Sequence, residues 1–229
     1  MPQQQGLVLP PTSAEERQLV QSLCSAPCIV TSQPVIVKRP AGWVGRLPLI
    51  KKLTSKWELG LWEDEGKDLS FGELPYVDQL SLGGPSLESL EGFSAPRLRG
   101  IAIGYSPRLL SLRLTNPLSE GVSVGLGGIA PTNLEGLGLE NLKTLSRFSI
   151  GQVFEVSLGA LRNITLIESL EISQTSISDL SPLNPQLRVT KFFKAASNQV
   201  LTDCQLRELA ARTGAPQRQT SITQNQPCP

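Results

Sequence analysis

The stretch that decides the fold is PYVDQLSL at residues 75–82, because close copies of it recur about every ten to eleven residues. The next copies are PSLESL at 85–90, PRLRGIAI at 96–103 and PRLLSLRL at 107–114. They share the pattern Pro-x-Leu-x-x-Leu-x-Leu. A repeat of fixed period is typical of a solenoid, in which each unit buries its apolar face against its neighbours.

The central apolar residues of the units form two interleaved ladders, each with a period of about 21–22 residues, a length typical of one coil of a solenoid. The first ladder is Leu59, Leu80, Ile101, Val122, Phe148 and Leu170, and the second is Leu69, Leu90, Leu112, Leu137, Leu158 and Leu180. Each ladder has one longer step, which places one insertion between Val122 and Leu137. The Gly- and Pro-rich segment 125–133 is therefore predicted to be a bulging loop. In the segment 153–167, Val156 is an alternative centre to Leu158.

The two leucines of each Leu-x-Leu point to the same face of a strand, because side chains alternate with period two. Proline before each centre suits a corner of the coil. Each coil is therefore predicted to contain two short strands, and the stacked coils two parallel sheets around an apolar interior. Short amphipathic helices are the alternative, which 18 prolines and 20 glycines disfavour. We expect Leu80, Ile101, Leu112, Leu137 and Leu170 to be buried, and Ser81, Arg113 and Glu171 to be exposed.

The ladders resemble leucine-rich repeats, and the Pro-containing corners resemble more closely the bacterial receptor L-domain-like proteins. IESLEISQTSISDL at 167–180 matches the leucine-rich consensus, with Thr175 where a buried Asn is usual. Asn116-Pro117 and Asn184-Pro185 are similar to the Asn-Pro corners of receptor L-type repeats. The resemblance covers roughly residues 57–200. It implies a mainly β, right-handed parallel β-solenoid over 35–200, with a tail and helical cap at 1–34 and a capping helix and tail at 201–229.

Four cysteines bear on the compartment. Residues 202–214 read as a short helix, with Thr202 or Asp203 as N-cap and Gly214 just beyond its end. A disulfide between Cys204 and Cys228 would hold the polar tail against this helix, and receptor L-like proteins are similar here. Cys24 and Cys28 either close a small ring or are free thiols. Paired cysteines indicate an oxidising compartment, and the alternative is four reduced thiols in the cytosol.

Composition excludes several kinds of chemistry. The chain has no histidine, so catalysis by Ser-His-Asp or Cys-His and histidine metal sites are excluded. The acidic run 63–65 with Asp68 reads as a solvated corner, and the glycines at 125–128 lack the Lys-Ser/Thr of a phosphate loop. We therefore predict no catalytic residue, cofactor or metal. A net charge of +1 and 5% aromatic residues give no case for a nucleic-acid partner.

No apolar run is long enough for a transmembrane helix. The N-terminus lacks the features of a signal peptide, so the protein is either cytosolic or the sequence begins after a leader.

Two surface features are candidate partner sites. All three tryptophans lie close together near the N-terminal end with three lysines between or beside them: Trp43, Trp57, Trp62, Lys51, Lys52 and Lys56. They form either a binding hot spot or a seal over the first coil. The second is a basic cluster of Arg97, Arg99, Arg108 and Arg113, for which a solvated surface is the alternative. Other outward positions at strand centres are small (Ser81, Ala102, Ser123, Ser149, Gly138 and Ser181), which predicts binding at the corners, the 125–133 loop or the ends.

The sequence thus predicts a non-enzymatic recognition or scaffold module of a bacterium, extracellular, periplasmic or at the cell surface, with a protein or glycan partner. The first alternative is a cytoplasmic leucine-rich-repeat adaptor. The second is a parallel β-helix enzyme acting on polysaccharides, which would need clustered outward carboxylates on one sheet.

Overall fold

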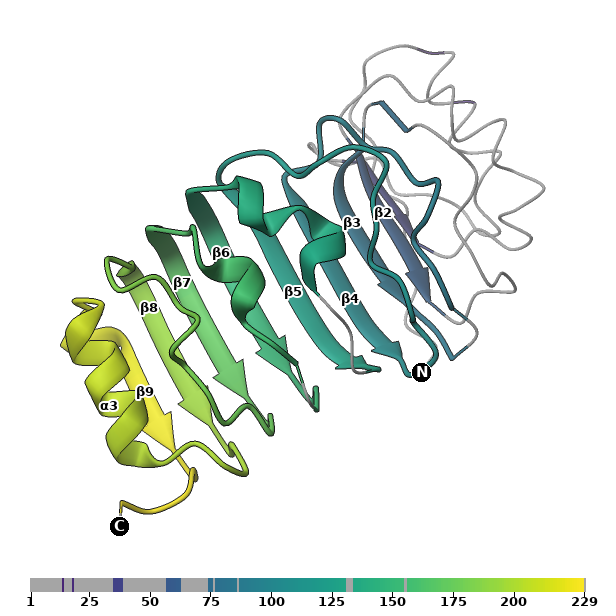
Figure 1. Ribbon diagram of the computed structural model, residues 1–229. Coiled ribbons are helices and arrows are strands. Elements are labelled where there is room, and N and C mark those ends of the chain that lie inside the picture. Colours follow the sequence, from purple (N-terminus) through teal and green to yellow (C-terminus); the bar gives the residue numbers. More distant parts are fainter. Residues whose placement is uncertain are drawn as a thin grey trace.

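A computed structural model describes residues 14, 18, 35–38, 57–62 and 74–228, except 76, 86, 131–133 and 155. Within this part the chain forms one parallel sheet of nine strands, in which each strand lies beside the next one in sequence (Figure 1). The strands are β1 Val35–Lys38, β2 Trp57–Trp62, β3 Val77–Gly83, β4 Gly100–Ser106, β5 Val122–Ile129, β6 Thr144–Gly151, β7 Leu166–Ser173, β8 Arg188–Ala196 and β9 Thr220–Thr223.

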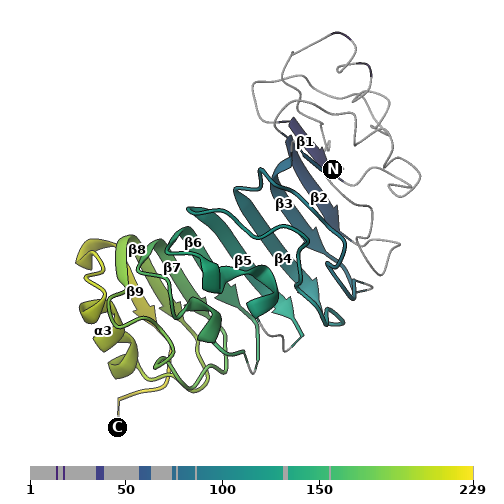
Figure 2. The same ribbon diagram turned by 45° about the horizontal axis from the view of Figure 1, so that its top comes forward.

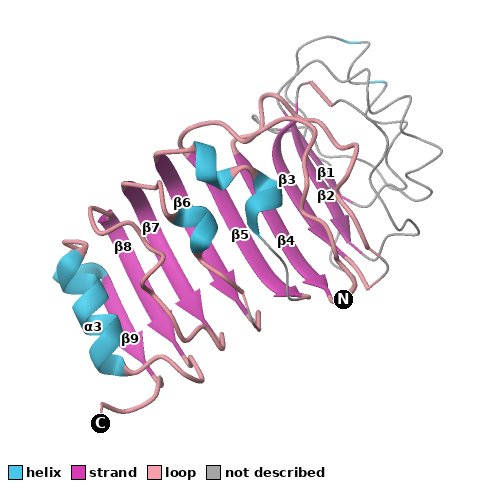
Figure 3. Ribbon diagram, in the orientation of Figure 1, coloured by secondary structure: helices cyan, strands magenta, loops and turns pink. Residues whose placement is uncertain are grey.

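The connections between strands return along one face of this sheet. Three 3-10 helices lie on them, η1 Leu134–Leu137, η2 Leu139–Asn141 and η3 Gly159–Leu161, and a fourth, η4 Gln217–Gln219, immediately precedes β9. Figure 3 shows these short helices and loops on the same side of the strands. Figure 2 shows the α-helix at one end of the row of strands, with β1 at the other. The arrangement is compatible with a parallel β-solenoid, and its right-handed sense stays a prediction.

The register of the sheet follows the first predicted ladder. Leu59 pairs with Leu80, Leu80 with Ile101, and Phe148 with Leu170, as the period requires. One predicted member of this ladder, Val122, was wrong. Val124 is the residue that pairs with both Ile101 and Phe148. The column extends beyond the predicted ladder to Phe193 of β8. Its members from Leu80 onward are buried in one apolar core, as β-strands with a single covered face require.

The prediction of two parallel sheets was wrong. The second ladder contributes core residues but no strands, since only the isolated bridge between Ser89 and Ser111 pairs its described coils. Leu90, Leu112, Leu137 and Leu158 are nevertheless buried. The same Leu spacing therefore fills the interior from an irregular segment, where turns and 3-10 helices satisfy the backbone instead of a ladder.

The predicted bulging loop at 125–133 was also wrong over most of its length, because residues 125–129 belong to β5. Gly125 and Gly127 occupy positions that alternate with the buried Val124 and Leu126, so they face away from the core. Gly127 pairs with Gly104 on one side and Gly151 on the other. The glycines thus mark outward positions, where the core demands no side chain.

A residue of left-handed backbone conformation follows each strand from β6 to β9, and β4 and β5 each contain one at the last position but one. These residues are Tyr105, Gly128, Gln152, Gln174, Ser197 and Gln224, with φ between 47° and 61°. One such residue per coil turns the chain out of the sheet at the same level, and glycine supplies this conformation only once. These corners could not be predicted from the sequence, because Gln and Tyr rarely adopt the left-handed conformation.

A buried polar column follows these corners in the last three coils. The side chain of Asn198 accepts hydrogen bonds from the N–H (3.2 Å) and hydroxyl (2.8 Å) of Thr175 and donates to the carbonyl of Ile172 (3.0 Å). It also donates to the side-chain oxygen of Asn225, 2.9 Å away. Asn225 in turn donates to the carbonyl of Ala195 (3.2 Å). This ladder ties the coils together where the chain leaves the sheet.

The predicted C-terminal helix is present as α3, Asp203–Arg212, and packs against β8 and β9. Thr202 is its N-cap and shares a capping box with Gln205. At its end Gly214 has φ 67°, and the N–H groups of Gly214 and Ala215 donate to the carbonyls of Ala211 and Ala210. These bonds form a Schellman motif.

A disulfide joins Cys204 and Cys228, with Cα atoms 5.4 Å apart, as the sequence predicted. The tail is held in a second way, because Thr202 and Gln226 form a parallel bridge. Cys24 and Cys28 lie outside the described residues.

The predicted burial is confirmed for Leu80, Ile101, Leu112, Leu137 and Leu170, each at most 2% exposed. Arg113 is exposed, as predicted. Ser81 and Glu171 point outward but are half-buried rather than exposed, and Arg147 and Lys194 cover Glu171.

Candidate binding face

The outer side of the sheet is the surface away from the returning connections. Because alternate side chains of every strand point to it, three rows of outward positions cross the strands. From β3 to β5 the middle row carries the small residues Ser81, Ala102 and Gly125, which are register neighbours. From β6 to β8 several outward positions are charged or aromatic. We call the group Arg147, Glu168, Glu171, Lys191, Phe192 and Lys194 the outer charged face.

Glu171 of β7 stands at the centre of the outer charged face. Its carboxylate accepts a hydrogen bond from Arg147 on β6 at 3.1 Å and from Lys194 on β8 at 2.6 Å. The hydroxyl of Ser149 lies 3.4 Å from the same carboxylate. Register explains the meeting, because Ser149, Glu171 and Lys194 are direct partners on adjacent parallel strands. One carboxylate therefore serves two cations, and the triad carries a net positive charge.

A second pair flanks this triad. Lys191 donates to Glu168 at 2.8 Å, and the Lys191 side chain is exposed whereas Glu168 is half-buried. Phe192 is half-buried and pairs through the backbone with Ser169, whose other partner is Arg147. Phe192 and Arg147 thus belong to one row of outward positions, on β8 and β6. Their backbones are about 10 Å apart at the usual spacing of strands. Aromatic and Arg side chains are those that most often anchor protein interfaces.

The triad holds Glu171 ionised. Burial alone would raise the pKa of Glu171, but the hydrogen bonds and charges of Lys194 and Arg147 together outweigh burial and lower it. Arg147 and Lys194 remain 56% and 40% exposed at their side chains, whereas Glu171 is 17% exposed. A partner approaching this face therefore meets two accessible cations over a carboxylate that is already fully engaged.

A second glutamate with a lowered pKa, Glu120, has a structural role. Glu120 accepts from the Thr144 hydroxyl at 2.6 Å and from the backbone N–H groups of Thr144 and Lys143. The hydrogen bond from the Thr144 side chain is the main cause of its lowered pKa. Glu120 thus joins neighbouring coils at the corner before β6.

The four predicted arginines do not form one cluster. Arg97 and Arg99 lie just before β4, whereas Arg108 and Arg113 follow it. Strand β4, about 20 Å long at the usual rise per residue, lies between Arg99 and Arg108, and Arg113 lies on the returning connection. Arg99 is also engaged by Asp78 at 3.5 Å. Arg97, Arg99, Asp78 and Glu120 line a hollow of about 580 Å³ in which the charges balance.

The tryptophan-rich candidate lies outside what the structure describes. Trp43, Lys51, Lys52 and Lys56 are not described, and for Trp57 and Trp62 only their backbone position in β2 is given. Whether these residues form a partner site or a seal over the first coil therefore stays untested, and both functions stay predictions.

Two outward carboxylates of the described sheet, Glu168 and Glu171, have cationic partners, and only Glu171 was expected from the sequence to face outward. Among the described residues, no group of three or more His, Cys, Asp or Glu could hold a metal ion. None of the described helices has the length and hydropathy of a membrane span. Comparison with protein-family models, with curated proteins and with solved structures finds no match.

Sequence reasoning predicted Glu171 to face outward but missed its cationic neighbours, because the first ladder ended at Leu170. The prediction of small outward residues is confirmed for Ser81, Ala102, Ser123 and Ser149, but it left out the large side chains of Arg147, Phe192 and Lys194 in the same rows. The signal was present, since FSI at 148–150, LEI at 170–172 and FKA at 193–195 share the period of the first ladder. Extending the ladder by one step to Phe193 places Glu171 and Lys194 side by side.

Proposed function

We propose that this protein is a non-enzymatic recognition or scaffold module that binds a protein partner across the outer charged face. The observation that carries the proposal is the triad of Arg147, Glu171 and Lys194 beside Phe192, on a side of the sheet that no described connection covers (Figure 3). A parallel sheet with a polar, charged outer side exposes oriented side chains on a rigid base. Such a base lowers the conformational cost of binding.

The proposal includes a secreted, periplasmic or cell-surface location in a bacterium and a leucine-rich-repeat or receptor L-like ancestry. The disulfide between Cys204 and Cys228 supports an oxidising compartment. The polar column of Thr175, Asn198 and Asn225 supports the likeness to leucine-rich repeats, since Thr175 stands where that repeat places a buried Asn. A cytosolic adaptor with the same surface is the competing function.

Charge reversal on the outer face tests the binding function. The wild-type protein and the variant Lys194→Glu are immobilised and exposed to proteins of the source organism's envelope fraction, and captured proteins are cross-linked and identified. We expect one or more proteins whose capture falls at least tenfold in the variant. The matched control is Arg113→Glu, the same change of charge on the irregular side of the coil. Equal loss in both variants, or no loss in Lys194→Glu, would contradict the proposal.

Two further readouts separate the competing functions. A glycan array probed with the same two variants should give no signal that depends on Lys194 if the partner is a protein. Titration of free thiols in protein purified from its native compartment without reductant should leave Cys204 and Cys228 unreactive. Reactive thiols at both positions would favour the cytosolic adaptor.

A further inference from the structure

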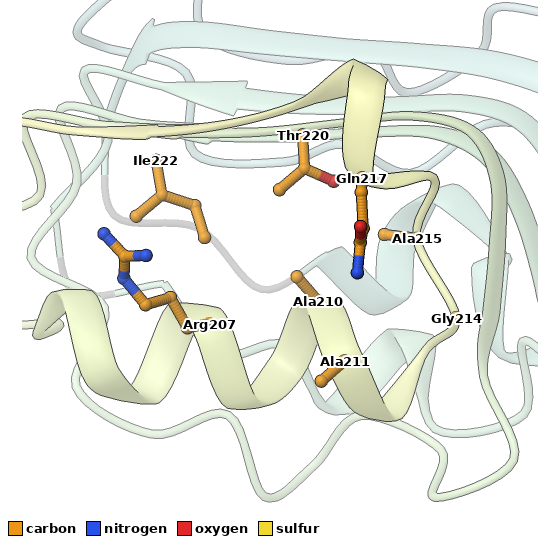
Figure 4. A pocket seen from close by; sticks show the side chains of 8 residues that line it. All are labelled: Arg207, Ala210, Ala211, Gly214, Ala215, Gln217, Thr220 and Ile222. Carbon is orange, nitrogen blue, oxygen red and sulfur yellow. The ribbon is translucent and has the colours of Figure 1, made fainter.

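The last strand of the sheet has a free edge beside a groove. Strand β9 pairs with β8, and no described strand lies on its other side. Between β9 and α3 is a cavity of about 720 Å³, lined by Arg207, Ala210, Ala211, Gly214, Ala215, Gln217, Thr220 and Ile222. Figure 4 shows Ile222 and Thr220 from β9 and Ala210 from α3 around one space, with Arg207 at one end and Gln217 near Ala215 at the other. We call this cavity the end groove.

The apolar floor of the end groove is the uncovered end of the core. Leu206 and Leu209 of α3 are fully buried, but the next residues towards the end are small: Ala210, Ala211 and Ala215. Small side chains leave the space that a bulky residue would fill. Ile222 is only half-buried although it belongs to the row of buried Ile172 and Ala195. The groove therefore offers apolar surface next to an unpaired strand edge.

The charge of the groove is positive. No Asp or Glu lines it, whereas Arg207 does. A second guanidinium lies at its rim, since a Cβ added at Gly214 would be 3.5 Å from two nitrogens of Arg188. Within the described part of the chain, neither arginine forms an ion pair. A second copy of this chain paired edge to edge would bring these arginines towards each other, so charge disfavours self-association here.

We propose that the end groove binds an extended acidic segment of another protein, which adds alongside β9 as a further parallel or antiparallel strand. Main-chain hydrogen bonds to the four residues of β9 give a short β-augmentation. An apolar side chain of the segment fills the space over Ile222 and Ala210, and an acidic side chain pairs with Arg207 or Arg188. This site is separate from the outer charged face and does not depend on it.

A random twelve-residue peptide library displayed on phage tests the proposal, with the full chain as bait. We expect recovered peptides enriched in Asp or Glu together with β-branched or aromatic residues. Their binding should fall at least tenfold in Arg207→Glu and in Ala211→Trp, which fills the groove without changing its charge. Both changes are at exposed positions, so the fold should persist. Binding should be unchanged in Arg147→Glu, which alters only the outer charged face.

Hydrogen exchange gives a second readout, because added strand pairing should slow exchange of the β9 amides when a recovered peptide is bound. Recovery of no peptides, of peptides without acidic residues, or of peptides indifferent to both groove variants would overturn the proposal. So would a concentration-dependent dimer that Ala211→Trp abolishes, since the occupant of the groove would then be a second copy. Loss of binding in Arg147→Glu alone would support the outer charged face and refute the end groove.

Discussion

Removal of one buried amide side chain should weaken three successive coils at once. Asn198 is 2% exposed, and its side chain makes four hydrogen bonds, two with Thr175 and one each with Ile172 and Asn225. Each bond contributes about 1 kcal/mol, and a buried donor or acceptor left without a partner costs about 1–3 kcal/mol. Because the Asn225 side of the column is half-exposed and water can replace that bond, we expect Asn198→Ala to lower the free energy of unfolding by about 3–5 kcal/mol.

Urea unfolding followed by circular dichroism measures this loss. The matched control is Asn163→Ala, which removes a single hydrogen bond to the carbonyl of Glu140 and should cost about 1 kcal/mol. Native-state hydrogen exchange should show that Asn198→Ala loosens β7 to β9 more than β3 to β5, since coils of a solenoid interact mainly with their neighbours. A loss no larger than that of Asn163→Ala would refute the reasoning that this column joins the coils.

Three further changes test other parts of the structure. Leu170→Ala should cost about 2–5 kcal/mol and Ser169→Ala less than about 0.5 kcal/mol in the same urea assay, and equal costs would reject the register. Cys228→Ser should lower stability by about 3 kcal/mol, because the bridge closes a loop with a sequence separation of 24; an unchanged melting temperature would show that the bond constrains nothing. The pKa of Glu171 is lowered from its ordinary 4.5, so its stabilising effect is present above that pH and is lost as the pH falls through the folded-state pKa. Glu171→Gln should therefore flatten the decline of stability below about pH 4.5, and an unchanged decline would contradict the triad.

The spacing of apolar residues along the chain predicted the register of the sheet, because burial of one face allows few registers. A slip by one residue would turn the whole row of Leu80, Ile101 and Leu170 to solvent, so apolar spacing determines the pairing. The error at Val122 has the same origin, because Val122 and Val124 are both buried and periodicity alone cannot choose between them. The C-terminal helix and its disulfide were predictable from local capping chemistry and cysteine placement.

The number of sheets and the binding faces could not be predicted from the spacing of apolar residues. Leucines spaced three residues apart can fill the core from a strand or from an irregular turn. Leu112 and Leu137 therefore did not indicate that their segments form no strands. The triad around Glu171 depends on side chains more than twenty residues apart meeting across strands, which requires a register that is correct through β8. The end groove depends on the small size of Ala210 and Ala211 at the end of the core, a feature that carries no sequence motif.

The outer face can act as one binding surface only if β4 to β9 form one continuous sheet. Distance measurement by pulsed electron paramagnetic resonance tests this most directly, with spin labels on ketone-bearing amino acids introduced at Ala102 and Ser221 so that no cysteine is changed. The two positions belong to one outward row, on β4 and β9, through the pairings of Gly125, Ser149, Glu171 and Lys194. Five strand spacings give a backbone separation of about 24 Å, and we expect one narrow distribution near that value once the length of the labels is included. A broad distribution, or one centred beyond about 40 Å, would contradict the single sheet and both proposed binding surfaces with it.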